Sequence, residues 1–111
     1  MAIRFGFVGF RHGHIYSLLN KINETEGVEA VAACEEHAET RDEATGKGVN
    51  ITHDTAAELI ENADCDVIAT GDYFANRGSV MIAALKAGKH AISDKPLCTS
   101  LAEIDEIERL A

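Results

Sequence analysis

A glycine-containing turn near the start of the chain has the composition of an anion-binding site. The turn has the sequence GFRHGH from Gly9 to His14, and it lies between an apolar segment and a segment with helical periodicity. Because the first backbone N–H groups of a helix have no acceptor within the helix, its start favours a phosphate or another anion. The turn is also compatible with a plain strand-to-helix connection that uses glycine for its permissive backbone.

The same turn matches only part of the G-x-G-x-x-G pattern of dinucleotide-binding turns. Gly9 occupies the first position, Arg11 the second and His14 the third, while Gly13 is one residue out of register. The side chain of Arg11 would either obstruct a pyrophosphate or place a cation beside it. The predicted pyrophosphate contacts are the six turn residues Gly9, Phe10, Arg11, His12, Gly13 and His14.

An acidic residue follows the second apolar segment at a spacing that suits ribose binding. Glu35 comes 21 residues after His14, close to the interval of about 20 that precedes the carboxylate accepting ribose hydroxyls. Glu36 and His37 follow it with no adjacent Lys or Arg, so a 2′-phosphate would meet negative charge there. The pattern favours NAD over NADP, although a solvated acidic loop would have the same composition.

These residues are positioned by a predicted alternation of strands and helices. Strands that are separated by helices must run parallel and be joined by right-handed crossovers. We therefore predict a doubly wound, Rossmann-type parallel α/β sheet with strand order 3-2-1-4-5, whose ligand site lies at the carboxyl ends of the strands. The five predicted strands are residues 3–9, 28–34, 49–52, 66–70 and 90–93.

The helices between these strands are predicted from apolar periodicity and from capping residues. Ile15 and Ile22 begin and end an i, i+3, i+4, i+7 series, and a polar helix is predicted over 38–45. Thr55 and Ser100 each precede a Glu by three residues, which is a capping box. Gly88 is a predicted helix C-cap before the last strand.

Composition and charge limit the classes of function. The 111 residues predict one domain, 1–111, and ten Lys and Arg against nineteen Asp and Glu give a formal net charge of −9. This charge disfavours nucleic acid and anionic membrane surfaces as partners. With no apolar run near the roughly 18 residues of a membrane span and no signal peptide, we expect a cytoplasmic protein. The odd number of cysteines and the two-residue H-x-H pair predict neither a disulfide framework nor a metal site.

A segment after the last predicted strand carries a family resemblance. Residues 87–97 read AGKHAISDKPL, which resembles the A-G-K-H-V-x-x-E-K-P-L segment of the glucose–fructose oxidoreductase and inositol dehydrogenase (Gfo/Idh/MocA) family. Residues 66–70, DVIAT, resemble that family's D-x-V-x-I-A-T strand. The resemblance covers essentially the whole chain. It implies the dinucleotide-binding domain of an NAD(P)-dependent oxidoreductase that acts on a hydroxyl or carbonyl of a sugar, a polyol or a similar compound.

The resemblance also implies roles for particular residues. Lys95 would be the catalytic lysine, orienting the substrate hydroxyl and assisting proton transfer. Pro96 restricts the residue before it to extended backbone, which fixes how Lys95 leaves the chain. The implied cofactor contacts in this part of the chain are Thr70, Gly71, Asp94 and Pro96.

Members of the resembled family continue into a second α/β domain that supplies most substrate contacts. We therefore expect the 111 residues to bind a dinucleotide, to need a second domain for a small-molecule substrate, and to be inactive alone. A non-catalytic nucleotide-binding sensor or assembly module is the alternative. Because residues 90–93 would form an uncovered sheet edge, we also expect the chain to pair as a two-fold homodimer.

Overall fold

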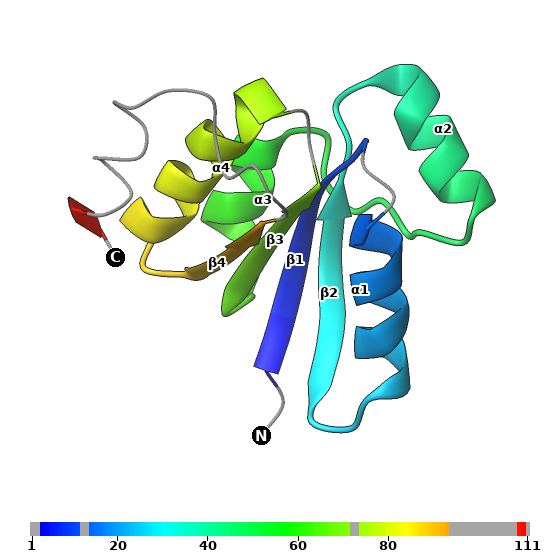
Figure 1. The fold of residues 1–111 in the computed structure, drawn as a ribbon, viewed down its shortest axis with the longest axis horizontal. Coiled ribbons are helices and arrows are strands. Elements are labelled where there is room, and N and C mark those ends of the chain that lie inside the picture. Colours follow the sequence, from blue (N-terminus) through cyan, green and yellow to red (C-terminus); the bar gives the residue numbers. More distant parts are fainter. Residues whose placement is uncertain (1–2, 12–13, 72–73, 94–108, 111) are drawn as a thin grey trace.

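The computed structural model describes residues 3–11, 14–71, 74–93 and 109–110, and within these it contains a parallel α/β sheet. The sheet order is β2-β1-β3-β4, so the chain starts near the centre and builds outward on both sides (Figure 1). The predicted parallel sheet is confirmed. Its four strands are β1 (Ile3–Phe10), β2 (Val28–Cys34), β3 (Val67–Gly71) and β4 (His90–Ser93).

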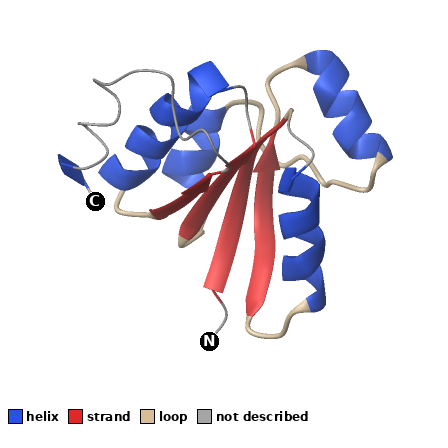
Figure 2. Ribbon diagram, in the orientation of Figure 1, coloured by secondary structure: helices blue, strands red, loops and turns tan. Residues whose placement is uncertain are grey.

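Helices cover both faces of this sheet, as in a doubly wound fold (Figure 2). Thr55 caps α3 as predicted, because its side chain accepts a hydrogen bond from the Glu58 N–H. Gly88 ends the last connection with a positive φ of 79°, as expected of a C-cap glycine. The helices are α1 (His14–Glu24), α2 (Ala38–Gly46), α3 (Ala56–Asn62) and α4 (Phe74–Lys86).

The core divides into two layers because successive strand residues point to opposite faces. Phe7 points toward α1, where it joins Ile15 and Ile22 in one buried cluster. Val8 and Ile68 point to the other face and pack against α3 and α4. Each face of the sheet is therefore covered, and the parallel pairing of the strands brings their carboxyl ends to one edge of the domain.

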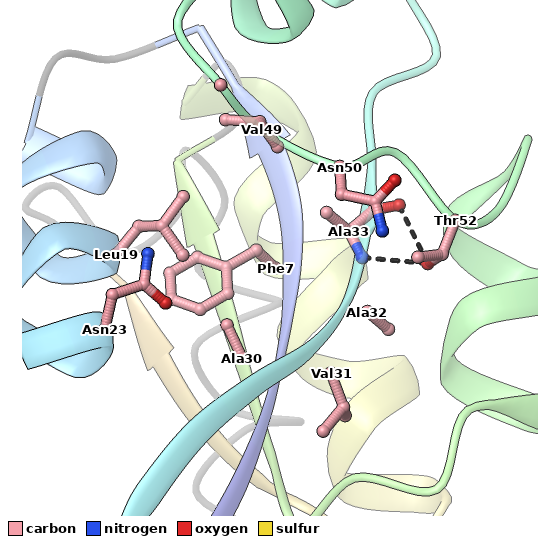
Figure 3. Close-up of a pocket in the computed structure, with 11 residues that line it drawn as sticks. Phe7, Leu19, Asn23, Ala30, Val31, Ala32, Ala33, Val49, Asn50 and Thr52 are labelled. Atoms are coloured by element: carbon pink, nitrogen blue, oxygen red, sulfur yellow. Dashed lines mark hydrogen bonds between the residues drawn. The ribbon is translucent and has the colours of Figure 1, made fainter. Parts of the chain in front are cut away.

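One predicted strand is wrong. Residues 49–52 do not form a strand, and the segment meets β2 at an isolated bridge between Cys34 and His53 and at the Thr52 N–H, which donates to Ala33 O at 2.8 Å. The reason is visible at Ala33, whose N–H donates to the Thr52 hydroxyl at 3.0 Å rather than to a backbone carbonyl (Figure 3). A side chain therefore takes the place of one rung of the ladder, and a cavity of about 230 Å³ remains between this segment and α1.

Several predictions concern segments at the limits of the described structure. β4 lies at the edge of the sheet among the described residues, and its Ile92 is 43% exposed, but the homodimer stays a prediction. Residues 100–108 of the helix expected after Ser100, and the thiol of Cys98, lie outside the described residues, while Arg109 and Leu110 are helical. No helix in the described part of the chain is both long and apolar enough to cross a membrane.

The substitution of Thr52 by Val should test the side-chain rung. Valine keeps the volume but cannot accept the hydrogen bond from Ala33, so an amide that is partly buried loses its acceptor. We expect the free energy of unfolding in urea to fall by about 1–2 kcal/mol. Thr45→Val is the matched control because, among the described residues, its hydroxyl bonds only to Arg41 O on an exposed helix face. Equal losses in both variants would contradict this account.

Candidate functional site

Gly9, the first residue of the predicted glycine turn, lies near the end of β1 and has a left-handed backbone. Gly9 has a φ of +85°, a conformation that glycine adopts without the steric cost of a Cβ. β1 continues one residue beyond its predicted end, because Phe10 still pairs with Gly71 of β3. The Arg11 N–H donates to Gly71 O at 3.1 Å. The chain therefore leaves the sheet only after Arg11, close to the end of β3.

A buried carboxylate ties this turn to the end of β2. The Glu35 side chain is only 1% exposed, and its Oε1 accepts a hydrogen bond from the Phe10 N–H at 2.8 Å. Its Oε2 accepts hydrogen bonds from the His37 N–H at 2.8 Å and from Arg11 Nε at 3.2 Å. A buried carboxylate is stable only with such donors around it.

Arg11, which occupies the second position of the glycine pattern, points sideways toward Glu35. Its Nη2 lies 3.1 Å from Glu35 Oε2, and its side chain is 13% exposed. The guanidinium and the carboxylate thus form a largely buried ion pair between the ends of β1 and β2. The Arg11 cation is thus directed along the edge of the sheet toward Glu35, whose carboxylate compensates its charge.

Close packing of α1 onto the sheet depends on a glycine in β3. A Cβ placed on Gly71 would lie 2.7 Å from Ile15 Cβ and 3.2 Å from Gly9 O. In the G-x-G-x-x-G pattern the third glycine allows this approach of helix and strand, but His14 occupies that position here. The missing side chain that lets α1 approach the sheet is instead that of Gly71, on the strand side of the contact between Ile15 and β3.

Tyr16 covers the turn from the side of α1. Its ring lies 5.6 Å from that of Phe10, between ring centroids, and Lys47 Nζ is 4.3 Å from the Tyr16 ring centroid. Burial raises the pKa of the Tyr16 phenol, and the carboxylates of Glu43 and Glu35 raise it further. The hydroxyl has no hydrogen-bond partner within the described structure. Because its pKa is raised, the phenol stays protonated at neutral pH.

A cavity lies on the other side of the same sheet edge, between α3 and α4. It measures about 370 Å³, and its wall is mainly apolar, with Arg11, Glu36 and Ser79 as the polar members. Glu36 is exposed and its Oε2 accepts a hydrogen bond from the Ala56 N–H at 2.9 Å. The apolar part of the wall consists of Ala56, Ala57, Ile60, Val80 and Ala83.

Sequence reasoning missed this cavity and the position of Glu36 in its wall. A signal was present, because consecutive residues in extended chain point to opposite sides. If Glu35 points inward, Glu36 must point outward. The contribution of α3 could not be found in this way, since it depends on how two helices meet across the sheet.

The structure brings together part of the predicted site. Gly9, Phe10, Arg11 and Glu35 meet at one edge with Gly71, and the buried Thr70 pairs with Val8 in the sheet below them. His14 is the exposed first residue of α1. The other predicted site residues, which are His12, Gly13, Asp94, Lys95 and Pro96, lie outside the described residues.

The sheet order, the helices on both faces and the left-handed glycine before α1 define a Rossmann-type nucleotide-binding domain. A comparison with protein families then identifies the group. The profile of the Gfo/Idh/MocA oxidoreductase family, described as having an NAD-binding Rossmann fold, matches residues 3–111. The chain therefore belongs to this family and is its NAD-binding Rossmann domain. Among curated proteins there is no significant match.

Solved structures agree with this assignment at the level of the fold. A provisionally assigned oxidoreductase from Erwinia carotovora atroseptica SCRI1043 is 28% identical, with a TM-score of 0.86 over 97% of this chain and 32% of its own. Biliverdin reductase from Synechocystis sp. PCC 6803, in complex with biliverdin and NADP+, is 24% identical, with a TM-score of 0.83 over 98% of this chain and 34% of its own.

A third neighbour was solved with the other cofactor. The WlbA dehydrogenase from Bordetella pertussis, in complex with NADH and UDP-GlcNAcA, is 20% identical, with a TM-score of 0.83 over 99% of this chain and 34% of its own. The chain thus spans about a third of the length of each of these proteins. Because one neighbour holds NADP+ and another NADH, membership of this group leaves the choice of cofactor open.

Replacement of Gly71 by Ala should measure how much the domain depends on the close approach of α1 and β3. The added methyl would force Ile15 or the strand to shift, and we expect a loss of about 1–3 kcal/mol in the free energy of unfolding. Gly46→Ala is the control, because nothing lies within 4 Å of its Cβ position at the end of α2. Urea denaturation followed by circular dichroism would compare them, and similar midpoints would argue against a packing role for Gly71.

Proposed function

We propose that this domain binds an NAD-type dinucleotide across the carboxyl ends of β1, β2 and β3 and presents it to a hydroxyl or carbonyl substrate. The observation that carries this proposal is the edge formed by Gly9, Arg11, Glu35 and Gly71 in a chain of this family. The substrate class, a sugar, polyol or similar compound, is supported by the family resemblance of residues 87–97. A second domain would supply the remaining substrate contacts.

The described residues fit a dinucleotide, with one departure from the usual turn. The N–H groups of Phe10 and Arg11 already donate to Glu35 and Gly71. The donors for a pyrophosphate would therefore come from the first turn of α1, which contains no acidic residue. The apolar cavity beside Arg11 and Glu36 offers room for the adenosine half. When bound, the nicotinamide supplies the hydride acceptor or donor of the reaction.

NAD is proposed as the preferred cofactor. The acidic pair at the end of β2 supports this preference, because a 2′-phosphate would approach a carboxylate there. Arg11 does not reverse it, since its charge is compensated by Glu35 at 3.1 Å.

Replacement of Gly9 by Ala should separate binding from folding. The left-handed backbone would cost alanine about 1–2 kcal/mol, and relief of that strain would move the start of α1 away from the pyrophosphate. We expect the affinity of the 111-residue chain for NADH, measured by fluorescence titration, to fall by about tenfold or more, which corresponds to about 1.4 kcal/mol.

Gly27→Ala is the matched control for this experiment. Gly27 has a φ of +86°, almost equal to that of Gly9, but it precedes β2 at the opposite end of the sheet. We expect Gly27→Ala to lose similar stability and to keep wild-type affinity for NADH. Equal affinities in the two variants would show that the turn does not bind the pyrophosphate.

Lys95 is proposed as the catalytic residue that orients the substrate hydroxyl and assists proton transfer. In an enzyme that contains this domain together with a substrate domain, we expect Lys95→Ala to lower kcat by about 10²–10⁴ and to leave the Kd for NADH nearly unchanged. Lys21→Ala, on the exposed surface of α1, serves as the charge control. An unchanged kcat for Lys95→Ala would show that Lys95 is only a turn residue.

A further inference from the structure

The two adjacent acidic residues after β2 lie in opposite environments. Glu35 is 1% exposed and is held by the turn of β1 through the Phe10 N–H and the Arg11 side chain. Glu36 is exposed at the wall of the 370 Å³ cavity. Because a bound molecule reaches side chains through their exposed surface, a ligand in this cavity meets the carboxylate of Glu36 first.

Glu36 is also fixed in place. Its Oε2 accepts a hydrogen bond from the Ala56 N–H at 2.9 Å, which is one of the N–H groups left without an intrahelical partner at the start of α3. Its Oε1 has no hydrogen-bond partner within the described part of the chain. One oxygen therefore anchors the side chain, and the other is open to accept a hydrogen bond from a ligand.

Exposing Glu35 to a ligand would disturb far more of the structure. Its carboxylate would have to leave the N–H groups of Phe10 and His37, at 2.8 Å each. The guanidinium of Arg11, which is only 13% exposed, would also lose its ion pair with Glu35. Breaking a buried ion pair by removing one member is strongly destabilising, because the remaining charge is left uncompensated.

We propose that Glu36, rather than Glu35, is the residue that sets the preference between NAD and NADP. This inference rests on the proposed function and deepens it at one contact. The Glu36 Oε1 accepts a hydrogen bond from a ribose hydroxyl of the adenosine half and repels a 2′-phosphate at the same place. Glu35 acts as a positioning residue that holds Arg11 in the wall of the cavity.

The decisive variant is Glu36→Gln. Its amide oxygen preserves the hydrogen bond from the Ala56 N–H, so the start of α3 keeps its partner. Its NH₂ group replaces a charged acceptor by a neutral donor at the wall of the cavity, which suits a phosphate. We expect the ratio of Kd values for NADPH and NADH, measured by fluorescence titration of the 111-residue chain, to shift by about tenfold or more toward NADPH. This shift equals the effect of about one hydrogen bond to a charged group.

Three further variants make the result specific. Glu29→Gln removes the same charge from an exposed position at the opposite end of β2, where Glu29 pairs in register with Arg4, and should leave the ratio unchanged. Glu35→Gln should weaken NADH and NADPH binding by similar factors and lower the midpoint of urea unfolding, because it weakens the pair with Arg11. Glu36→Ala, which also removes the anchor on α3, should lose selectivity while both cofactors still bind.

Three outcomes would overturn the inference. If Glu36→Gln and Glu29→Gln give the same ratio as the wild type, Glu36 does not contact the ribose. If Glu35→Gln shifts the ratio and Glu36→Gln does not, Glu35 leaves its ion pair and binds the ribose itself. If the wild-type chain binds neither NADH nor NADPH, the proposed function fails and this inference fails with it.

Discussion

The geometry of the candidate site depends on the buried pair of Glu35 and Arg11. A carboxylate with 1% of its surface exposed requires donors. Phe10 and Arg11 supply them from the end of β1, and the N–H of His37, two residues after Glu35, supplies another. These contacts join residues 24 and 25 positions apart in the sequence. They fix the ends of β1 and β2 relative to each other, and therefore also fix where α1 begins and where the cavity beside α3 opens.

The same constraint accounts for the unusual glycine turn. In a G-x-G-x-x-G turn, small residues let a pyrophosphate and a helix approach the strand. Here Arg11 occupies the second position, and its side chain forms an ion pair with Glu35. The close approach of helix and strand is provided by Gly71, whose Cβ position lies 2.7 Å from Ile15 Cβ. One of the three glycine functions, the close packing of helix against strand, is thus performed by another residue of the fold.

The sequence was sufficient for the parts of the fold that depend on local pattern. The strand and helix alternation, the Thr55 cap and the Gly88 turn follow from periodicity and capping chemistry. The predicted strand over 49–52 fails because pairing depends on a partner, and the Thr52 hydroxyl takes the Ala33 N–H that a ladder would use. The pairing of Glu35 with Arg11 could not be predicted either, since no local rule connects an arginine in one turn with an acid after the next strand.

The arrangement of the acidic pair shows why spacing alone does not assign a ribose ligand. The interval of about 20 residues places an acidic side chain at the end of the second strand, and both Glu35 and Glu36 satisfy it. Burial then separates them: Glu35 faces the turn, and Glu36 faces the cavity with one oxygen held by the Ala56 N–H. The inward carboxylate of Glu35 compensates Arg11 at the second position of the glycine pattern, which leaves the outward carboxylate of Glu36 as the net negative charge at the wall of the cavity. Arg11 at the second glycine position and the two adjacent acids after β2 therefore belong together electrostatically: one acid compensates the arginine, and the other remains charged at the cavity.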